Sequence, residues 1–387
     1  MDFLETIETI RAEEASVQRL FRGDGTGVRH ARRSPEYMGL LAEAATLVAD
    51  VCAGRKPMRY LSEAMSTSDF PQLFGDVLDR QLLANYRETP ITWPAYIKRS
   101  TVPDFRTVKR FRVDGAEGVL TEVPQGTGYP ATAITDAEYT YSVKKYGRRL
   151  PFLWEAFVND DLDALRDGPD RLARAARRTE ERFATGLFVG TDGPNSTFYA
   201  SGNANVVTGN PALSIESIQT AYTVLGSMVD TDGEPIVIDA AVLVVPPALE
   251  VVAQSILNAT VIRNTAATGG GASGRELEVA NWMRSKLKLV VNPYIPILAT
   301  NNKHTSWFLF SDPGNGRPAA EMGFLRGHEE PELFMKAPNA TRIGGGPVDP
   351  VTSGDFDTDS VDYKVRHVLG GTLLDPKMSV ASQGDGS

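Results

Sequence analysis

The stretch Lys145-Tyr146-Gly147-Arg148-Arg149-Leu150-Pro151, continued by Val158-Asn159-Asp160-Asp161-Leu162, connects an extended part of the chain to its strongest helix pattern. On the N-terminal side, tyrosine and valine alternate with threonine, serine and lysine, which predicts a half-buried strand over 138–153. On the C-terminal side, Asp167-Gly168-Pro169 predicts the start of a helix, because proline suits the first helical turn. We therefore expect an extended arm to pass into a long helix at about 169–188.

A second strand-like arm at 105–123 precedes this block, and glycine and proline are concentrated between the two arms. The connecting runs are Asp114-Gly115-Ala116-Glu117-Gly118 and Pro124-Gln125-Gly126-Thr127-Gly128-Tyr129-Pro130. This composition predicts a long β-hairpin with little core of its own. A loop of such length in a compact protein is usually functional or disordered.

The helix expected at about 169–188 combines a narrow apolar stripe with many charges. The stripe consists of Leu172, Ala176, Phe183 and Leu187, and the remaining faces carry Arg171, Arg174, Arg177, Arg178, Glu180, Glu181 and Arg182. A long helix with so thin a stripe packs on one side and leaves another side for solvent or a neighbouring molecule.

The pattern predicts helices before the hairpin and a mixed α/β region over 190–380. Helices are expected at 1–22, 35–52, 70–86, 214–229, 246–258 and 275–284. Strands are expected at 236–245, 287–291, 306–311, 332–336, 361–368 and 371–380.

Composition excludes several classes of protein. The chain has 387 residues and a formal net charge of −9, so it has room for two or three domain-sized units and is unlike a basic nucleic-acid-binding domain. A single cysteine, Cys52, excludes an intrachain disulfide framework. The charged N-terminus and the short apolar runs predict neither a signal peptide nor a membrane helix, so we expect a protein made and kept in a cytoplasm.

Residue patterns for catalysis, metals and cofactors are missing from the sequence. The four histidines lack HExxH spacing, and no GxSxG elbow marks a serine. The glycine-rich run 269–276 has Arg275 and Glu276 where a phosphate-binding loop needs lysine and serine or threonine. The run that begins at Asp355 has Ser360 and Arg366 where a calcium loop needs glycine and glutamate. We therefore predict no enzyme, no cofactor and no metal site.

Several stretches, in this order, resemble a phage major capsid protein, and more narrowly the phage Mu-type major head subunit family. They are DFPQLF (69–74), LANY (83–86), VPDF (102–105), KYGRRLP (145–151), VNDDL (158–162), LVVPPALE (243–250), LVVNP (289–293), WFLFSDP (307–313) and DYKVRH (362–367). The first 60 residues and the tail after Asp375 lie outside the resemblance. Asn292 stands where that family's aspartate would be expected.

The resemblance implies an α+β fold of the Hong Kong 97-like capsid type. Its parts would be an N-terminal helical extension (1–60), an N-arm (61–104), an extended β-hairpin or E-loop (105–145), a peripheral domain with the spine helix (146–235), an axial α/β domain (236–330), and returning strands with the C-terminal tail (331–387). We expect the extension to be retained and to pack on the shell or on a neighbouring subunit, the alternative being a scaffolding segment that a protease removes.

The function that the resemblance implies is that of a major capsid protein. It would assemble as hexamers and pentamers into an icosahedral shell around double-stranded phage DNA, in the host cytoplasm, and would end in the virion capsid. Partners would be further copies of the chain, a portal, and scaffolding or decoration proteins, without a membrane. The arginines of the spine helix could contact DNA weakly, although ion pairs with Glu180 and Glu181 are the preferred interpretation. An encapsulin-type nanocompartment and a cytoplasmic α/β hydrolase are the alternatives.

Charge suggests where subunits would meet. The candidate contact residues are Lys109, Arg110, Arg112, Glu117, Tyr129, Glu329 and Glu330. In this hypothesis a basic hairpin arm meets an acidic surface of a neighbour, and two independently solvated faces are an equal alternative. We expect 114–135 to be poorly ordered in an isolated subunit. Because 113–137 contains no lysine, the isopeptide cross-link known from some relatives is not expected.

Overall fold

The computed structural model of the protein describes 35–52, 54–57, 60, 70–114, 123, 125, 135–153, 162–230, 233–238, 240–265, 276–314, 316–336 and 360–386. Two units emerge from the contacts within the chain. The first comprises Met1–Pro90, Lys145–Thr179 and Gly327–Val368, and the second comprises Ile91–Lys144, Glu180–Arg326 and Leu369–Ser387. The helix expected at 1–22 lies outside the described residues.

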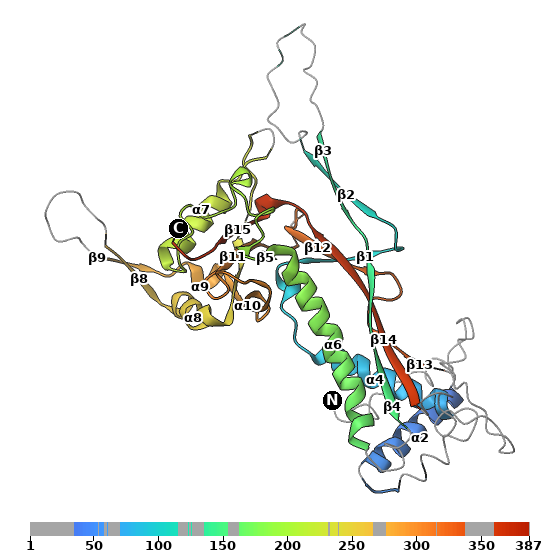
Figure 1. Cartoon of the computed structure of the whole chain (residues 1–387). Coiled ribbons are helices and arrows are strands. Elements are labelled where there is room, and N and C mark those ends of the chain that lie inside the picture. Colours follow the sequence, from blue (N-terminus) through green and yellow to red (C-terminus); the bar gives the residue numbers. More distant parts are fainter. Residues whose placement is uncertain are drawn as a thin grey trace. The chain divides into compact units, whose positions relative to one another are not determined.

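The first unit combines helices with strands of a sheet (Figure 1). Helix α4 (Phe70–Glu88) contacts helix α2 (Pro35–Cys52) and strand β13 (Glu332–Met335). Strand β13 is antiparallel to strand β14 (Ser360–Leu373), which also pairs with strand β4 (Lys144–Leu153). The sheet therefore brings together two segments that are distant in sequence.

Helix α6 (Leu162–Phe188) contributes to a core cluster of the first unit. Its Leu172 and Ala176 are buried against Leu82 and Tyr86 of α4. The two residues of each helix are four positions apart, so each helix presents one apolar face to the other. Burial of a leucine side chain stabilises such a core by about 2 kcal/mol.

The second unit is built on a four-stranded sheet with the order β10-β7-β11-β15. These strands are Lys288–Val291, Ala240–Val245, Trp307–Ser311 and Ser379–Ser382. Strands β10 and β7 are parallel, and the other pairs are antiparallel. Helix α7 (Ile215–Gly226) contacts β15 and β7.

Aromatic side chains fill the core beside this sheet. The ring of Phe188, the last residue of α6, lies 4.9 Å from Phe308 and 5.3 Å from Phe310, in edge-to-face geometry. Tyr96 packs on Phe188 at 5.5 Å. Such edge-to-face pairs add to the stabilisation that burial alone provides.

A second sheet region of this unit carries the candidate site. Strand β1 (Lys98–Val102) runs parallel to β12 (Ala320–Leu325), and β12 is antiparallel to the Leu369–Leu373 part of β14. Strands β2 (Val108–Asp114) and β3 (Thr135–Tyr141) pair only with each other among the described strands. We call this pair the β2–β3 ribbon.

Shorter elements complete the described chain. They are β5 (Val189–Gly190), β6 (Gly193–Pro194), α8 (Glu250–Asn258), β8 (Val261–Thr265), β9 (Glu276–Ala280), α9 (Met283–Lys286), α10 (Ile295–Leu298) and the 3-10 turns η2 (Trp93–Ala95), η3 (Ser201–Asn203), η4 (Pro247–Leu249) and η5 (Pro376–Met378).

The predicted helices at 35–52, 70–86, 214–229 and 246–258 are confirmed within a few residues, whereas two other predictions need correction. The long helix begins at Leu162 and not near Pro169, so the proline lies inside the helix. The helix predicted at 275–284 is strand β9 followed by the short helix α9. Pairing of β9 with β8 outweighs the local helical pattern there.

The extended regions also differ from the prediction. The arm at 138–153 is two strands with different partners, since β3 pairs with β2 and β4 pairs with β14. The strands predicted at 361–368 and 371–380 merge into β14, followed by the separate strand β15. Strand β14 continues through Gly370. The lack of a side chain at this position lets the backbone of Ser142 approach, since a Cβ atom there would lie 2.5 Å from the Ser142 carbonyl oxygen.

Candidate subunit interface

Several side chains of the β2–β3 ribbon are exposed to solvent. Its register runs from Val108 opposite Tyr141 to Asp114 opposite Thr135. Phe111, at its centre, is 60% exposed. A two-stranded ribbon is marginally stable in water without a third strand or a packed face. The ribbon thus has surface and strand edges available for another molecule.

A buried carboxylate holds the base of the ribbon to the second sheet region. Glu321 on β12 is 3% exposed, and its Oε1 accepts hydrogen bonds from Ser100 Oγ at 2.6 Å, Tyr141 OH at 2.5 Å and Arg110 Nε at 2.8 Å. Arg110 Nη2 also donates to Ser100 Oγ at 3.2 Å. We call Ser100, Arg110, Tyr141 and Glu321 the Glu321 cluster.

The Glu321 cluster is electrostatically satisfied. Burial alone would raise the pKa of Glu321, but hydrogen bonds from Ser100, Tyr141 and Arg110 lower that pKa below its usual range. Burial and the Glu321 carboxylate together raise the pKa of the Tyr141 hydroxyl. A buried charge that keeps several strong donors is fixed in place, because removing any donor leaves it poorly compensated.

Room for this contact depends on Gly323. A Cβ atom at position 323 would lie 2.5 Å from the Tyr141 hydroxyl and 2.8 Å from a Val102 methyl group. Glycine therefore lets the Tyr141 side chain cross β12 and reach Glu321. The sequence did not mark Glu321 as a functional candidate. Its signal is an acidic residue inside an otherwise apolar run, AEMGFL (320–325).

Two of the predicted basic contact residues have partners within their own unit. Lys109 forms an ion pair with Glu138 across the ribbon at 2.8 Å. Arg110 forms an ion pair with Glu321 at 2.8 Å. Arg112 belongs to β2, but its side chain lies outside the described set, as do Glu117 and Tyr129 altogether.

The predicted acidic contact residues are in the first unit. Glu330 accepts two hydrogen bonds from Arg87, at 3.1 and 3.0 Å, and Glu329 is half-buried. The nearby Glu332 contacts His328 and Arg366. The structure therefore gives Glu330 an intramolecular partner, and the proposed pairing with a neighbour's basic arm stays a prediction.

The arginines of α6 differ in their surroundings. Arg177 Nε donates to the Tyr86 carbonyl oxygen at 2.6 Å, and its guanidinium lies 3.5 Å from the centre of the Tyr86 ring. Arg171, Arg174 and Arg178 are exposed. Arg174 and Arg178 make no ion pair with another described residue.

Glu180 and Glu181 accept hydrogen bonds from residues outside α6, and their expected ion pairs with these arginines stay a prediction. Both glutamates are buried. Glu180 shares a helix face with the buried residues Ala184 and Phe188, which follow it at intervals of four residues. Glu180 Oε2 accepts from the Trp93 indole at 3.3 Å, and Glu181 accepts from the Thr92 backbone N–H at 3.1 Å.

Glu181 acts as a cap for the η2 turn. Its carboxylate accepts from the backbone N–H and the hydroxyl of Thr92, the residue that precedes the turn. Burial raises the pKa of Glu181, and the hydrogen bonds from Thr92 only partly offset this effect. A carboxylate at this place satisfies backbone donors that the turn itself leaves open.

Asn292 connects three segments of the same core. Its Nδ2 donates to Tyr96 OH at 2.9 Å and to Thr185 Oγ1 at 2.8 Å, and its Oδ1 accepts from the Tyr294 backbone N–H at 2.8 Å. An amide supplies both donors and an acceptor here, which an ionised aspartate could not. The departure from the resembled family's aspartate thus has a structural role.

No group of three or more metal-ligating side chains occurs within the described part of the chain. Among its described helices, none combines the length and the hydropathy that a bilayer crossing requires.

Comparison with known proteins identifies the class. The family model described as phage capsid protein matches 137–381, which is more than half of the chain. No curated protein matches the sequence. The chain therefore belongs to the phage capsid protein family, a family of structural proteins. The prediction of a phage major capsid protein with an α+β, Hong Kong 97-like fold is thereby confirmed, and its location is the virion capsid.

Solved structures with similarity to the chain include phage and encapsulin proteins. Gordonia phage Cozz has 14% identity, with 76% of this chain and 87% of that chain covered, at a TM-score of 0.44. The structure from Mycobacterium phage Cain has 12% identity, with 74% of this chain and 84% of that chain covered, at a TM-score of 0.44. The holo-SrpI encapsulin complex from Synechococcus elongatus has 11% identity, with 75% and 86% covered, at 0.44. The identification rests on the family model, which favours a phage capsid over the encapsulin and hydrolase alternatives.

Proposed function

We propose that this capsid protein self-assembles as hexamers and pentamers into an icosahedral shell that encloses double-stranded DNA in the host cytoplasm. The observation that carries the proposal is the β2–β3 ribbon, which is firmly attached at its base and has no further strand partner among the described residues. A second copy of the chain is the partner that makes such a ribbon stable.

Capsid parts can be assigned to the described elements on this basis. The β2–β3 ribbon would be the base of the E-loop, and α6 would be the spine helix of the peripheral domain. Helix α4 would belong to the N-arm, and the β10-β7-β11-β15 sheet to the axial domain. The unit boundaries place Glu180–Arg326 together, which favours an axial domain that begins earlier than position 236.

Assembly requires repeated contacts between unlike surfaces whose rotations close a shell. Each contact would be modest, so that misplaced subunits can leave while the finished shell is stable. Arg174 and Arg178 are the best-placed candidates of α6 for weak phosphate contact, since Arg177 is occupied by Tyr86. A portal and scaffolding or decoration proteins would complete the particle.

Negative-stain electron microscopy of the purified full chain tests the proposal. Closed shells or ring-shaped capsomers are expected, and a sample of uniform monomers under all assembly conditions would contradict it. Analysis of particles from infected or lysogenic cells then identifies the contents. Double-stranded DNA supports the phage head, whereas an enzyme cargo would support a nanocompartment.

A further inference from the structure

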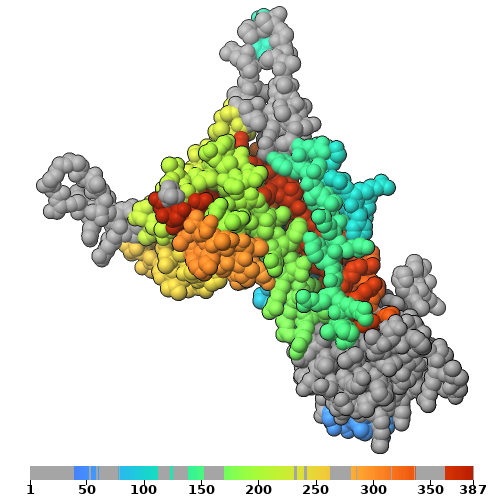
Figure 2. Space-filling view, in the orientation of Figure 1, coloured from blue at the N-terminus to red at the C-terminus, as the bar shows by residue number. Residues whose placement is uncertain are grey.

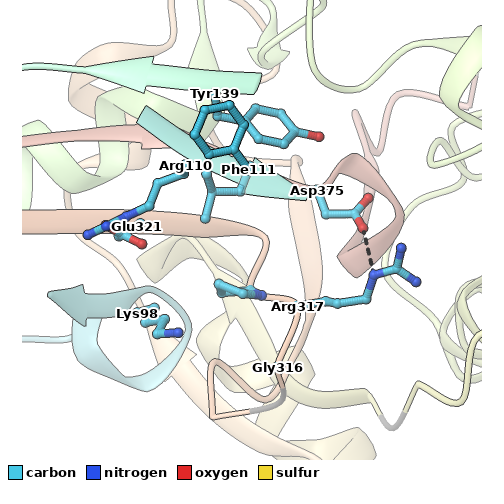
Figure 3. Close-up of a pocket in the computed structure, with 10 residues that line it drawn as sticks. Lys98, Arg110, Phe111, Tyr139, Gly316, Arg317, Glu321 and Asp375 are labelled. Carbon is cyan, nitrogen blue, oxygen red and sulfur yellow. Dashed lines mark hydrogen bonds and ion pairs between the residues drawn. The ribbon is translucent and has the colours of Figure 1, made fainter. Parts of the chain in front are cut away.

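A cavity of about 160 Å³ lies beside the Glu321 cluster in the second unit. The residues that matter for its chemistry are Lys98, Arg110, Phe111, Arg317, Glu321 and Asp375. Figure 3 shows Arg110 directed to Glu321 and Arg317 directed to Asp375 around this cavity. Neither its shape nor its residues were apparent from the sequence, because its walls come from segments more than 200 positions apart.

The charges around the cavity do not cancel. Glu321 is neutralised by Arg110 at 2.8 Å, and Asp375 is paired with Arg317 at 3.7 Å. Lys98 has no ion pair with any other residue of the described chain, and its side chain is exposed. One positive charge is therefore left over, in a protein whose formal net charge is −9.

The cavity also has an apolar wall that is open to solvent. Phe111 is 60% exposed, and Tyr139 of the neighbouring strand lines the same cavity. Figure 2 shows parts of the segments 98–111 and 138–144, coloured cyan to teal, at the surface in this view. An exposed aromatic side chain next to an unpaired ammonium group suits a carboxylate that is carried on an apolar stem.

We propose that an aspartate or glutamate side chain of a second copy of this chain enters the cavity in the assembled shell. Its carboxylate pairs with Lys98, and its methylene groups pack on Phe111. The inference rests on the proposed self-assembly. The complementarity is of charge, because every copy of the chain has a formal net charge of −9, whereas the cavity has one positive charge left over.

The same cavity is poorly suited to DNA. It offers a single uncompensated positive charge, because Arg110 and Arg317 are paired with Glu321 and Asp375. Proteins that bind nucleic acids non-specifically contact the phosphate backbone through several clustered cationic side chains. A protein side chain is therefore the occupant that the observations favour.

Lysine acetylation tests the inference on the wild-type full chain. Unassembled subunits and empty shells are treated with an N-hydroxysuccinimidyl acetate reagent and examined by peptide mass spectrometry. We expect acetylation of Lys98 to fall at least tenfold on assembly. Lys145, which is exposed in the first unit, is the reference lysine, and the inference requires no change in its acetylation. Equal acetylation of Lys98 in subunits and shells would overturn the inference and leave the proposed shell function intact.

Carbodiimide coupling identifies the partner. In shells assembled from a mixture of ¹⁴N- and ¹⁵N-labelled subunits, an amide between Lys98 of one isotope and an acidic residue of the other isotope is expected. Protection of Lys98 only in shells that contain DNA would identify DNA as the occupant and overturn the proposal. Failure of the wild-type chain to form any shell would overturn the proposed function and this inference together.

Variants give an independent measurement. Lys98→Met and Phe111→Ala should each slow assembly at least fivefold in light scattering, and Lys98→Met, which removes a charge, should also reduce the dependence of assembly on salt. Lys145→Met is the matched control and should assemble like the wild type. Thermal unfolding of the free subunits confirms that each variant is folded, and wild-type assembly rates for folded Lys98→Met would contradict the proposal.

Discussion

Arg110 Nε lies 2.8 Å from Glu321 Oε1, although 211 positions separate the two residues in the sequence. Arg110 belongs to the base of the β2–β3 ribbon, and Glu321 belongs to the buried strand β12. The attachment of the ribbon is therefore complete within one subunit. What remains for assembly is the exposed length of the ribbon, whose covering by another copy would release water from apolar surface such as Phe111.

Glu321→Ala should destabilise the free subunit by about 3 kcal/mol, because it leaves the Arg110 charge and two hydroxyl groups without their acceptor. Urea unfolding measures this change, and faster amide exchange at 108–114 should accompany it. Glu138→Ala is the control, since it removes only the exposed pair with Lys109 and should cost no more than about 1 kcal/mol. Equal stability of the two variants would show that the Glu321 cluster does not hold the ribbon.

Glu321 and Glu181, which are both buried, should respond to pH in opposite directions. The pKa of Glu321 is lowered in the folded state, so its stabilising contribution is present above the ordinary value of 4.5 and lost as pH falls through the lowered pKa. The pKa of Glu181 is raised, so its contribution is present below 4.5 and lost as pH rises through the raised pKa.

Replacement by glutamine separates these two effects. Relative to the wild type, Glu321→Gln should reduce the free energy of unfolding more at neutral pH than in acid. Glu181→Gln should reduce it more in acid than at neutral pH. Chemical unfolding of free subunits across this range gives both differences, and the same pH trend for both variants would refute the assignment.

Arg177 and Arg178 are neighbours on α6 with different expected importance. Arg177→Ala should destabilise the subunit by about 2 kcal/mol, because it removes a hydrogen bond from a charged donor and a contact with the Tyr86 ring. Arg178→Ala should change stability by less than about 0.5 kcal/mol, as is usual at an exposed position. Thermal unfolding of the two variants, measured in parallel, gives both losses of stability. Equal losses would contradict a structural role of Arg177.

Purified shells boiled in denaturant should release single chains of 42.0 kDa. The reason is chemical: 113–137 contains no lysine to form an isopeptide bond, and Cys52 is the only cysteine. A denaturing gel shows the outcome directly. A ladder of covalently joined subunits that survives a reducing agent would mean that a lysine elsewhere performs the cross-link.

The elements that could be predicted from sequence are those whose pattern is local. Helix α2 was placed at its observed bounds, since apolar residues at spacings of three and four and Pro35 at its start are sufficient. Strand β11 was likewise within one residue, because WFLFS is a continuous buried run. The capsid family itself was recognised from the order of such segments.

The Glu321 cluster could not be predicted, because its members come from strands β1, β2, β3 and β12. Neither the parallel pairing of β1 with β12 nor the crossing of Tyr141 over Gly323 leaves a pattern within one segment. The burial of Glu180 was missed for another reason. A charged side chain usually indicates an exposed position. Glu180, however, precedes the buried Ala184 by four residues, and this spacing places it on the buried face of α6.

The attachment of the ribbon also defines where foreign sequence could be tolerated. Arg110 and Tyr141 secure its two strands below the last observed pair, Asp114 opposite Thr135. A peptide epitope grafted between those two positions would replace none of the residues that bind Glu321. The same geometry ties position 141 to position 323, where glycine makes room for tyrosine. Homologous sequences should therefore exchange these two residues together, as a covarying pair.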